Sequence, residues 1–297
     1  MAAREAFGVP LPGIEVFWAS LSGAYFLAGL YDGVADKGTV SGRDFSGQTG
    51  LLRFAKRPVK RWFLALGVNL VLVYSALRAY VSGVPAYGWV SAAVDSVSLA
   101  DAQPEDHLSV VLASGLLTIH LIQKLDQSVF VHVYSSSTQG PLDFLAPYLY
   151  AAGVSLTLFA QAPALHGTTE PWFHWSSFKW YHLLGVGLFA WVTYQDHACQ
   201  PALSNTRRNR AGHIVTVDHK LPKGGWYDTV ACPGYLMTVL SHVAIGVTLG
   251  PQHGSWWVCT GYVTISHVVR ALERRRWYRL KYEDFPRSRK AIFPKLL

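Results

Sequence analysis

Apolar residues dominate seven stretches of this 297-residue chain, and polar stretches separate them. Each stretch approaches the roughly 20 residues that a helix needs to cross a lipid bilayer. The pattern therefore predicts an all-α membrane protein, a bundle of about seven transmembrane helices. The predicted spans are Ile14–Tyr31, Trp62–Val81, Leu108–Ile122, Leu142–Ala160, Trp180–Tyr194, Val230–Gly250 and Ser255–Leu272.

The composition agrees with a membrane protein. Only 15% of the residues are charged and 51% are hydrophobic, whereas soluble domains carry about 25% charged residues. The first span lacks a basic segment before it and a cleavage site of small residues after it, so we interpret it as a retained helix. We expect residues 1–297 to form a single membrane domain.

The cations are distributed unevenly between the two sides of the predicted bundle. If the seven spans alternate in direction, all 26 Lys and Arg residues except Arg4, Arg78, Lys179 and Arg270 fall on one side. Basic loops stay in the cytosol, so the loops 36–61 and 195–229 and the C-terminal tail are predicted to be cytosolic. Cations beside apolar spans favour lipid headgroups or a phosphorylated cofactor as partners, and not nucleic acid.

Metal binding is not expected. Cys199, Cys232 and Cys259 lack the spacing of a zinc or redox site, and two of them fall within predicted spans.

The third span carries a candidate catalytic face. His120, Lys124 and Gln127 follow one another at helical spacing, which places them on one side of a helix. Ionisable groups within a span are costly unless they face a cavity or a partner. We interpret this face as the wall of an active site. The alternative is that Lys124 and Gln127 have already left the membrane and that His120 bonds a neighbouring helix.

The loop Asn205–Gly225 has the features of an anion-binding segment. Two turn-forming sequences, NRAG and LPKGG, flank the extended pattern HIVTV, and Lys220 and Lys223 lie beside a glycine pair. A cytosolic loop would be basic in any case, but it would not need the paired turns. Arg270, near the end of the last span, could extend to the headgroups or hold a phosphate inside the bundle. Neither GxGxxG nor GxxxxGK[ST] occurs.

These segments resemble the steroid 5-alpha-reductase family. The tail YEDFPRSRKAIFP resembles the family's terminal signature, and LPKGGWYD resembles its central loop motif. The similarity is nearest to the polyprenol reductase branch, through WYHLLGVGLFAW, LSNTRRNRAG, VDHKLPKGGWYDTV and, more weakly, PVKRWF and IHLIQKLDQSVFVHVYS. It is specific over residues 180–297 and patchy over 54–135.

The resemblance implies a multi-pass enzyme of the endoplasmic reticulum membrane. NADPH would bind from the cytosol, with 180–297 as the cofactor-binding part. The substrate would be a long polyisoprenoid, reduced at its α-isoprene unit toward the dolichol that protein N-glycosylation requires. We assign His120 and Lys124 as catalytic residues by their position. The residues that match family positions on the cofactor side are Asn205, Arg207, Lys220, Trp226, Tyr235, Arg270 and Tyr278.

Chemistry favours an aldehyde over an alcohol as the substrate. Hydride addition to an isolated alkene leaves the developing negative charge without a stabilising atom, whereas the carbonyl oxygen of an enal receives it. A protein donor can then stabilise that oxygen.

Several positions depart from the family pattern. Gly234 and Thr238 stand where an amide and a carboxylate are expected, Arg275 replaces a His, Gln127 a carboxylate and Lys124 an Arg. These differences leave open a catalytically degenerate, lipid-binding member. A steroid or enoyl reductase of the same family is a further alternative. An isoprenylcysteine-type methyltransferase fits poorly, because neither His213 nor His219 precedes a Pro.

Overall fold

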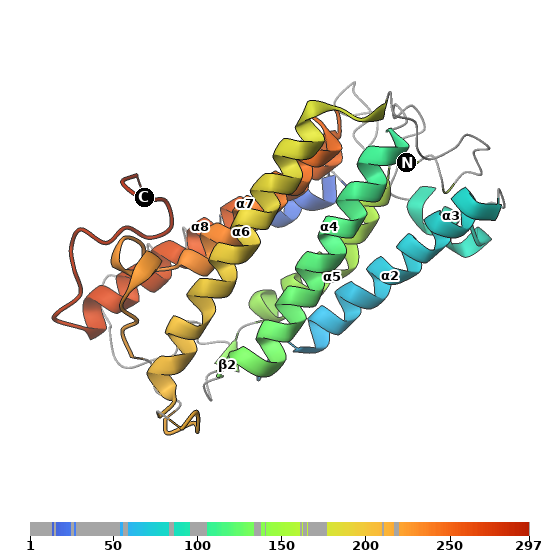
Figure 1. The fold of residues 1–297 in the computed structure, drawn as a ribbon. Helices are drawn as coiled ribbons and strands as arrows, with labels where there is room; N and C mark the ends of the chain where they lie inside the picture. The colour runs from blue at the N-terminus through green and yellow to red at the C-terminus, as the bar shows by residue number, and fades with distance from the viewer. Residues whose placement is uncertain are drawn as a thin grey trace.

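The chain folds into a bundle of long helices (Figure 1). The computed structural model describes residues 14, 16–24, 27, 54–55, 59–82, 86–95, 106–133, 138–139, 141–160, 162, 165, 177–209, 211–216 and 220–296. Residues 16–24 are helical, and the labelled helices are α2 (Val59–Ser82), α3 (Gly88–Asp95), α4 (His107–Asp126), α5 (Pro141–Phe159), α6 (Trp180–Ser204), α7 (Pro233–Leu249) and α8 (Gly254–Lys281). The prediction of an all-α fold is confirmed, with the exception of one pair of two-residue strands.

Each predicted span within the described residues coincides with a helix, but several helices are longer than predicted, α6 and α8 most of all. Helix α6 continues past Tyr194 to Ser204, and α8 continues past Leu272 to Lys281. Both extensions carry polar residues, which ended the hydropathy pattern without ending the helix. The short helix α3 was not predicted, and most of the predicted cytosolic loop 36–61 lies outside the described residues.

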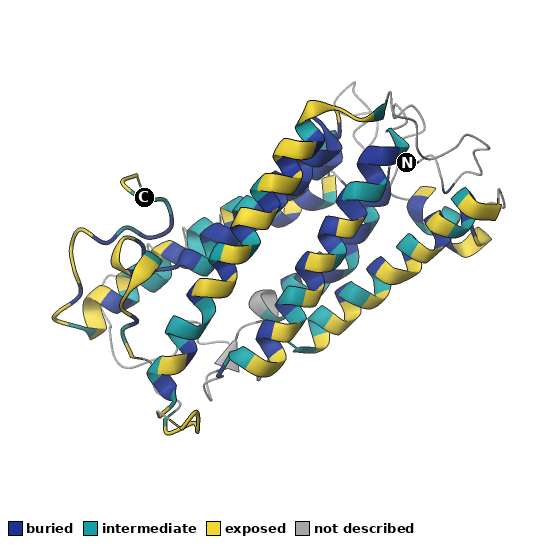
Figure 2. Cartoon of the chain, viewed as in Figure 1, coloured by how far each residue is buried: buried dark blue, intermediate teal, exposed yellow. Residues whose placement is uncertain are grey.

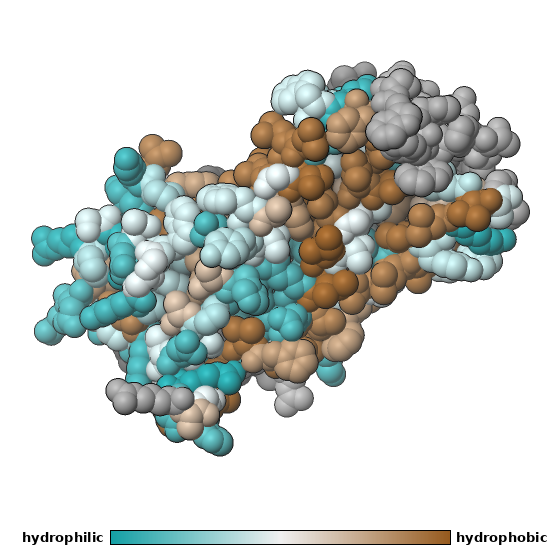
Figure 3. All heavy atoms as spheres, viewed as in Figure 1, coloured by the Kyte–Doolittle hydropathy of each residue, from teal (hydrophilic) through white to brown (hydrophobic). Residues whose placement is uncertain are grey.

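The surface of the bundle is consistent with a lipid environment. Within the described residues, 59–82 and 107–131 are helical segments long and apolar enough to cross a membrane, and 144–159 and 233–249 are shorter apolar ones. Large apolar side chains on the outer faces of α2 and α6 are exposed, among them Phe63, Tyr74, Leu183 and Tyr194 (Figures 2 and 3). Exposed apolar surface of this extent is typical of an interaction with lipid or protein. The number of spans and their sidedness remain predictions.

Segments that we predicted to share one side meet at one end of the bundle. Strand β1 (Phe54–Ala55), just before α2, pairs antiparallel with β2 (Thr138–Gln139), which follows α4. Arg208 donates to the carbonyl of Phe130, and Arg289 of the tail donates to the carbonyl of Pro222. We call this region the basic end. Figure 3 shows hydrophilic residues gathered there, around the C-terminus.

The most extensive contact between two helices joins α6 and α7, and it depends on Gly185. A Cβ added at this glycine would lie 2.8 Å from the backbone nitrogen of Thr248 and 2.9 Å from the carbonyl oxygen of Ala244, and it would also collide with the Thr248 hydroxyl. Glycine therefore allows the two backbones to approach closely, as small residues do at membrane helix interfaces. This crossing fixes α6 against α7.

We expect Gly185→Ala to destabilise the bundle by about 1–3 kcal/mol, because the added methyl group has no space. The measurement is thermal unfolding of the detergent-purified protein. Gly187→Ala is the matched control, since an added Cβ there meets nothing within 4 Å. Equal unfolding temperatures for the two variants would contradict the role of Gly185.

Candidate functional site

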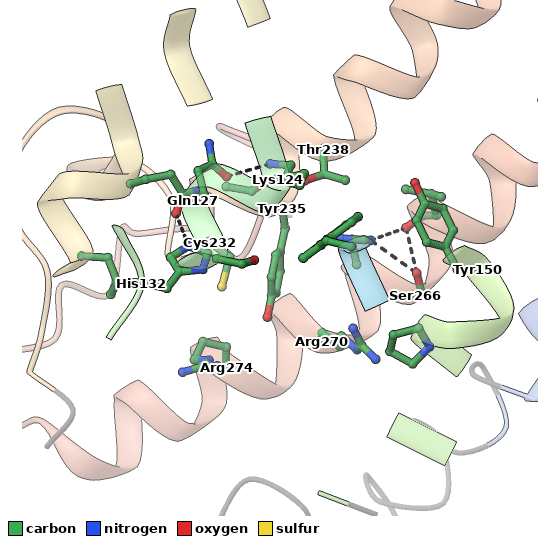
Figure 4. Close-up of a pocket in the computed structure, with 18 of the residues that line it drawn as sticks. Lys124, Gln127, His132, Tyr150, Cys232, Tyr235, Thr238, Ser266, Arg270 and Arg274 are labelled. Atoms are coloured by element: carbon green, nitrogen blue, oxygen red, sulfur yellow. Dashed lines mark hydrogen bonds between the residues drawn. The ribbon is translucent and has the colours of Figure 1, made fainter. Parts of the chain in front are cut away.

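A cavity of about 340 Å³ lies between the helices at the basic end (Figure 4). Its wall includes residues of α2, α4, α5, α6, α7 and α8, so segments far apart in sequence form it together. The volume falls near the lower limit of small-molecule sites, which span roughly 300–1,000 Å³. The cavity is therefore large enough for the reacting end of a ligand.

The wall of the cavity is cationic. Arg61, Lys124, Arg270 and Arg274 line it, and none of the described residues that line it is an Asp or a Glu. Cations that face a partly dry cavity attract an anion more strongly than the same cations in water. The planar guanidinium of arginine is suited to bidentate contact with a phosphate or a carboxylate. The cavity is therefore suited to a ligand that carries negative charge.

A change of helix type shapes the α4 side of the cavity. The α-helix ends at Asp126 and continues as a π-helix, η2 (Gln127–Val131), in which the backbone N–H of His132 bonds the carbonyl of Gln127 at 2.8 Å. Such wide turns occur frequently at functional sites. Lys124, Gln127 and His132 all line the cavity from this segment.

Lys124, which lines the cavity, forms an ion pair with Asp196 of α6. The ammonium nitrogen lies 2.6 Å from Oδ2 of Asp196, and both residues are buried. The same oxygen accepts from Nε2 of Gln127 at 2.9 Å and of Gln123 at 3.2 Å. Burying an ion pair requires this many hydrogen bonds, because desolvation costs several kcal/mol per ion.

Gln200 extends this network to His132. Nε2 of Gln200 donates to Oδ1 of Asp196 at 2.9 Å, so its Oε1 is the acceptor for Nε2–H of His132, also at 2.9 Å. Burial lowers the pKa of His132 below its usual value, although the bond to Gln200 opposes the shift. His132 is therefore a neutral imidazole at pH 7, with its proton on Nε2.

A second buried network lies on the α5 side of the cavity. Nδ1 of His242 lies 2.8 Å from the carbonyl oxygen of Thr238, which can only accept, so this nitrogen carries the proton. Nε2 therefore accepts from the hydroxyl of Tyr150, which lines the cavity, at 2.8 Å. His120 packs edge-on against His242 with ring centroids 5.5 Å apart.

Aromatic side chains cover the opposite part of the cavity. Tyr235 points from α7 toward the side of α8 that carries Arg270 and Arg274 (Figure 4). Its ring packs edge-on against His267, with centroids 5.1 Å apart. Tyr278 also lines the cavity and stacks on Phe285 of the tail, at 5.8 Å.

The C-terminal tail holds the loop before α7 in place. The backbone nitrogens of Ala231 and Cys232 donate to the carbonyls of Lys290 and Ala291 at 2.8 and 3.1 Å. Ala231 and Cys232 both line the cavity. The tail therefore fixes one part of the cavity wall.

Four of the residues predicted for the site meet at the cavity: Lys124, Tyr235, Arg270 and Tyr278. They come from α4, α7 and α8, and no short sequence motif contains them all. The structure thus brings together a predicted catalytic residue and three residues predicted for the cofactor side.

The other five predicted residues do not line the cavity. His120 lies behind the wall and is 1% exposed. Arg207 is buried and donates to the carbonyl of Val133, and Trp226 donates to Oε1 of Gln195 at 3.0 Å. Asn205 and Lys220 are exposed. The turns predicted at NRAG and LPKGG are present, with positive φ at Gly212, Gly224 and Gly225.

The positions that depart from the family pattern have local explanations. A Cβ added at Gly234 would lie 3.0 Å from Nε2 of Gln200, so the amide of Gln200 fills that space. The hydroxyl of Thr238 donates to the carbonyl of Gly234 at 3.0 Å. Arg275 donates through Nε to the carbonyl of Arg289 at 2.8 Å, which ties α8 to the tail.

The sequence did not indicate Asp196, Gln200, His132 or Arg274 as site residues. Asp196 and Gln200 lie beyond Tyr194, where the apolar pattern of the fifth span ends, and we assigned them to a loop. Helix α6 continues through both of them. A signal was available, because Asp196 follows Phe189 and Val192 at helical spacing and so continues the apolar face of that span.

Comparisons with known proteins agree with the resemblance of the motifs. Residues 157–297 match the family described as 3-oxo-5-alpha-steroid 4-dehydrogenase. The chain is 28% identical to a polyprenal reductase of Xenopus tropicalis, over 76% of this chain and 74% of the relative. The polyprenal reductases of Danio rerio and Homo sapiens are 29% and 26% identical, over 77% and 76% of this chain and 74% and 72% of theirs.

We expect Arg275→Ala to loosen the tail, because the variant loses the bonds to the carbonyls of Arg289 and Arg287. Limited proteolysis with trypsin, followed by mass spectrometry, should show faster cleavage in the segment 287–290. Arg279→Ala is the control on an exposed position of the same helix. Unchanged cleavage of the tail in Arg275→Ala would show that these bonds do not hold it.

Proposed function

We propose that this member of the steroid 5-alpha-reductase family, a reductase of carbon–carbon double bonds, reduces the α-isoprene double bond of a long-chain polyprenal with NADPH. The names of its relatives support the substrate class. The observation that carries the proposal is the cavity itself, which Lys124 of α4 lines together with Arg270, Arg274 and Tyr278 of the segment that matches the family.

The residues that line the cavity fit NADPH, a nicotinamide adenine dinucleotide phosphate. Three arginines and a lysine line the cavity, and aromatic rings cover its α7 and α8 side. A volume of about 340 Å³ suits the reacting ends of a cofactor and a lipid rather than the whole of either ligand. NADPH, when bound, supplies the hydride. Arg270, Tyr235 and Tyr278 are assigned to holding it, with Arg274 as an additional cation.

We assign to Lys124 the role of hydrogen-bonding the carbonyl oxygen of the substrate. An ammonium has three N–H donors; one meets Asp196 at 2.6 Å and another meets Oε1 of Gln127 at 3.4 Å. The remaining donor is available to a ligand. A fixed cation in a buried wall stabilises the negative charge that develops on the oxygen of an enal during reduction. An isolated alkene of an alcohol would gain nothing from it, which supports the aldehyde as the substrate.

In this proposal His120 has a different role from Lys124. It contacts His242 and not the cavity, so any effect on the substrate would pass through His242 and Tyr150. Asn205, Arg207, Lys220 and Trp226 are assigned to the surroundings of the basic end. There they hold the loop, or meet parts of the cofactor that extend beyond the cavity.

We place the basic end in the cytosol and the bundle in the endoplasmic reticulum membrane, as a multi-pass protein of seven spans. The gathering of the basic loop and the tail at one end of the helices supports this orientation. The product would be an intermediate on the way to the dolichol used in protein N-glycosylation. No metal and no nucleic acid is part of the proposal.

The direct test is to incubate the detergent-purified protein with NADPH and a long-chain polyprenal and to analyse the products by mass spectrometry. We expect the α-saturated aldehyde. A steroid enone and the corresponding polyprenol serve as alternative substrates. Tight NADPH binding without any α-saturated product would overturn the reductase assignment and favour a lipid-binding member without catalysis.

We expect Arg270→Ala to weaken NADPH binding by roughly tenfold to a hundredfold, the loss of about 1.5–3 kcal/mol for a charge-assisted hydrogen bond. Binding of the lipid should change much less. Equilibrium titration of each ligand measures the two effects, and Arg279→Ala is the control on an exposed position of the same helix. NADPH binding equal to that of the unmodified protein would remove Arg270 from the cofactor site.

A further inference from the structure

Asp196 is the common acceptor of the side chains that form one wall of the cavity. Its two carboxylate oxygens accept from Lys124 at 2.6 Å, from Gln127 and Gln200 at 2.9 Å, and from Gln123 at 3.2 Å. Three of these donors, Lys124, Gln127 and Gln200, line the cavity, whereas Asp196 does not. The carboxylate can therefore act on a ligand only through the groups that it holds.

The hydrogen bonds of this wall have a fixed direction. Because Nε2 of Gln200 donates to Asp196, its Oε1 accepts from His132 at 2.9 Å. Because Nε2 of Gln127 also donates to Asp196, its Oε1 faces the ammonium of Lys124 at 3.4 Å. An amide in place of the carboxylate would turn one N–H group toward these donors. The orientation of the wall thus depends on the negative charge at position 196.

The same region contains the positions that depart from the family pattern. Gln127 lacks a carboxylate, and Gly234 lacks an amide, where the resemblance leads us to expect them. A Cβ built on Gly234 would lie 3.0 Å from Nε2 of Gln200 and 4.0 Å from Oδ1 of Asp196. An amide and a carboxylate are therefore present beside these positions, but they come from α6.

We propose that Asp196 is a positioning residue of the reductase site, and that Asp196 and Gln200 of α6 supply the carboxylate and the amide that Gln127 and Gly234 do not. The proposal rests on the proposed function. Asp196 holds the ammonium of Lys124 at the cavity wall, with one N–H left for the carbonyl oxygen of the substrate. Gln200 occupies the space that an amide side chain at position 234 would fill, so the residues at positions 127, 196, 200 and 234 depend on one another.

The test moves the carboxylate from α6 to α4. Asp196→Asn keeps the shape of the side chain and removes its charge. In the double variant Asp196→Asn/Gln127→Glu, the new carboxylate stands beside Lys124, and the amide at position 196 can donate to it. We expect the single variant to lower kcat for polyprenal reduction roughly tenfold to a hundredfold, as small displacements of a catalytic group do. NADPH affinity should change little, and the double variant should recover most of kcat.

A second readout needs neither substrate nor cofactor. The 2.6 Å bond to Asp196 holds the amine of Lys124 in place, and acylating reagents reach an amine more often once it is no longer held. Acylation of Lys124, followed by peptide mass spectrometry, should become several-fold faster in Asp196→Asn and should return toward the original rate in the double variant. The exposed Lys223 serves as the internal control.

The possible results separate the two proposals. Loss of kcat and faster acylation in the single variant, with recovery in the double variant, support the positioning role. Unchanged kcat and acylation in Asp196→Asn, or equal losses in both variants, overturn it. If the unmodified protein does not reduce a polyprenal, the proposed function fails. The acylation of Lys124 then still decides whether Asp196 holds the ammonium.

Discussion

A buried ion pair can persist among apolar helices only where hydrogen bonds replace the water that both ions have lost. Lys124 and Asp196 meet this requirement with the amides of Gln123, Gln127 and Gln200. The pair joins α4 to α6, and the close contact at Gly185 joins α6 to α7. Three helices are thus connected, by the ion pair beside the cavity and by the Gly185 contact nearer the start of α6. The cationic wall depends on this arrangement, because without Asp196 the ammonium would face no described acidic group.

The position of the helices follows largely from the sequence, because apolar stretches of membrane length have few alternatives to a helix. What the sequence could not provide is where α6 and α8 end. Residues such as Asp196 and Arg274 stop the apolar pattern, yet the helix continues because these side chains find partners on other helices. Such partners are separated by many residues in the chain: Asp196 and Lys124 lie 72 positions apart. Hydropathy in a local window contains no information about them.

In the candidate site, too, the sequence identified some of the residues, whereas the packing of the helices decided where their side chains point. Lys124, Arg270 and Tyr278 could be chosen from helical spacing and from motifs, and all three line the cavity. His120 shares the helical spacing of Lys124, but its side chain faces His242 behind the wall. Arg207 lies in a motif of the expected kind, yet it serves to hold the carbonyl of Val133. Motifs therefore identified residues that meet at one cavity, whereas the direction of each side chain depended on the packing of α6 and α7.

The departures from the family pattern at first suggest lost chemistry, if each is considered alone. In three dimensions, Gln127, Gly234, Gln200 and Asp196 occupy one small volume, and each amide or carboxylate there has a partner. A carboxylate and an amide are thus present beside Gln127 and Gly234, and α6 provides both of them. This pattern favours a site that still works with a rearranged set of residues over one that has decayed.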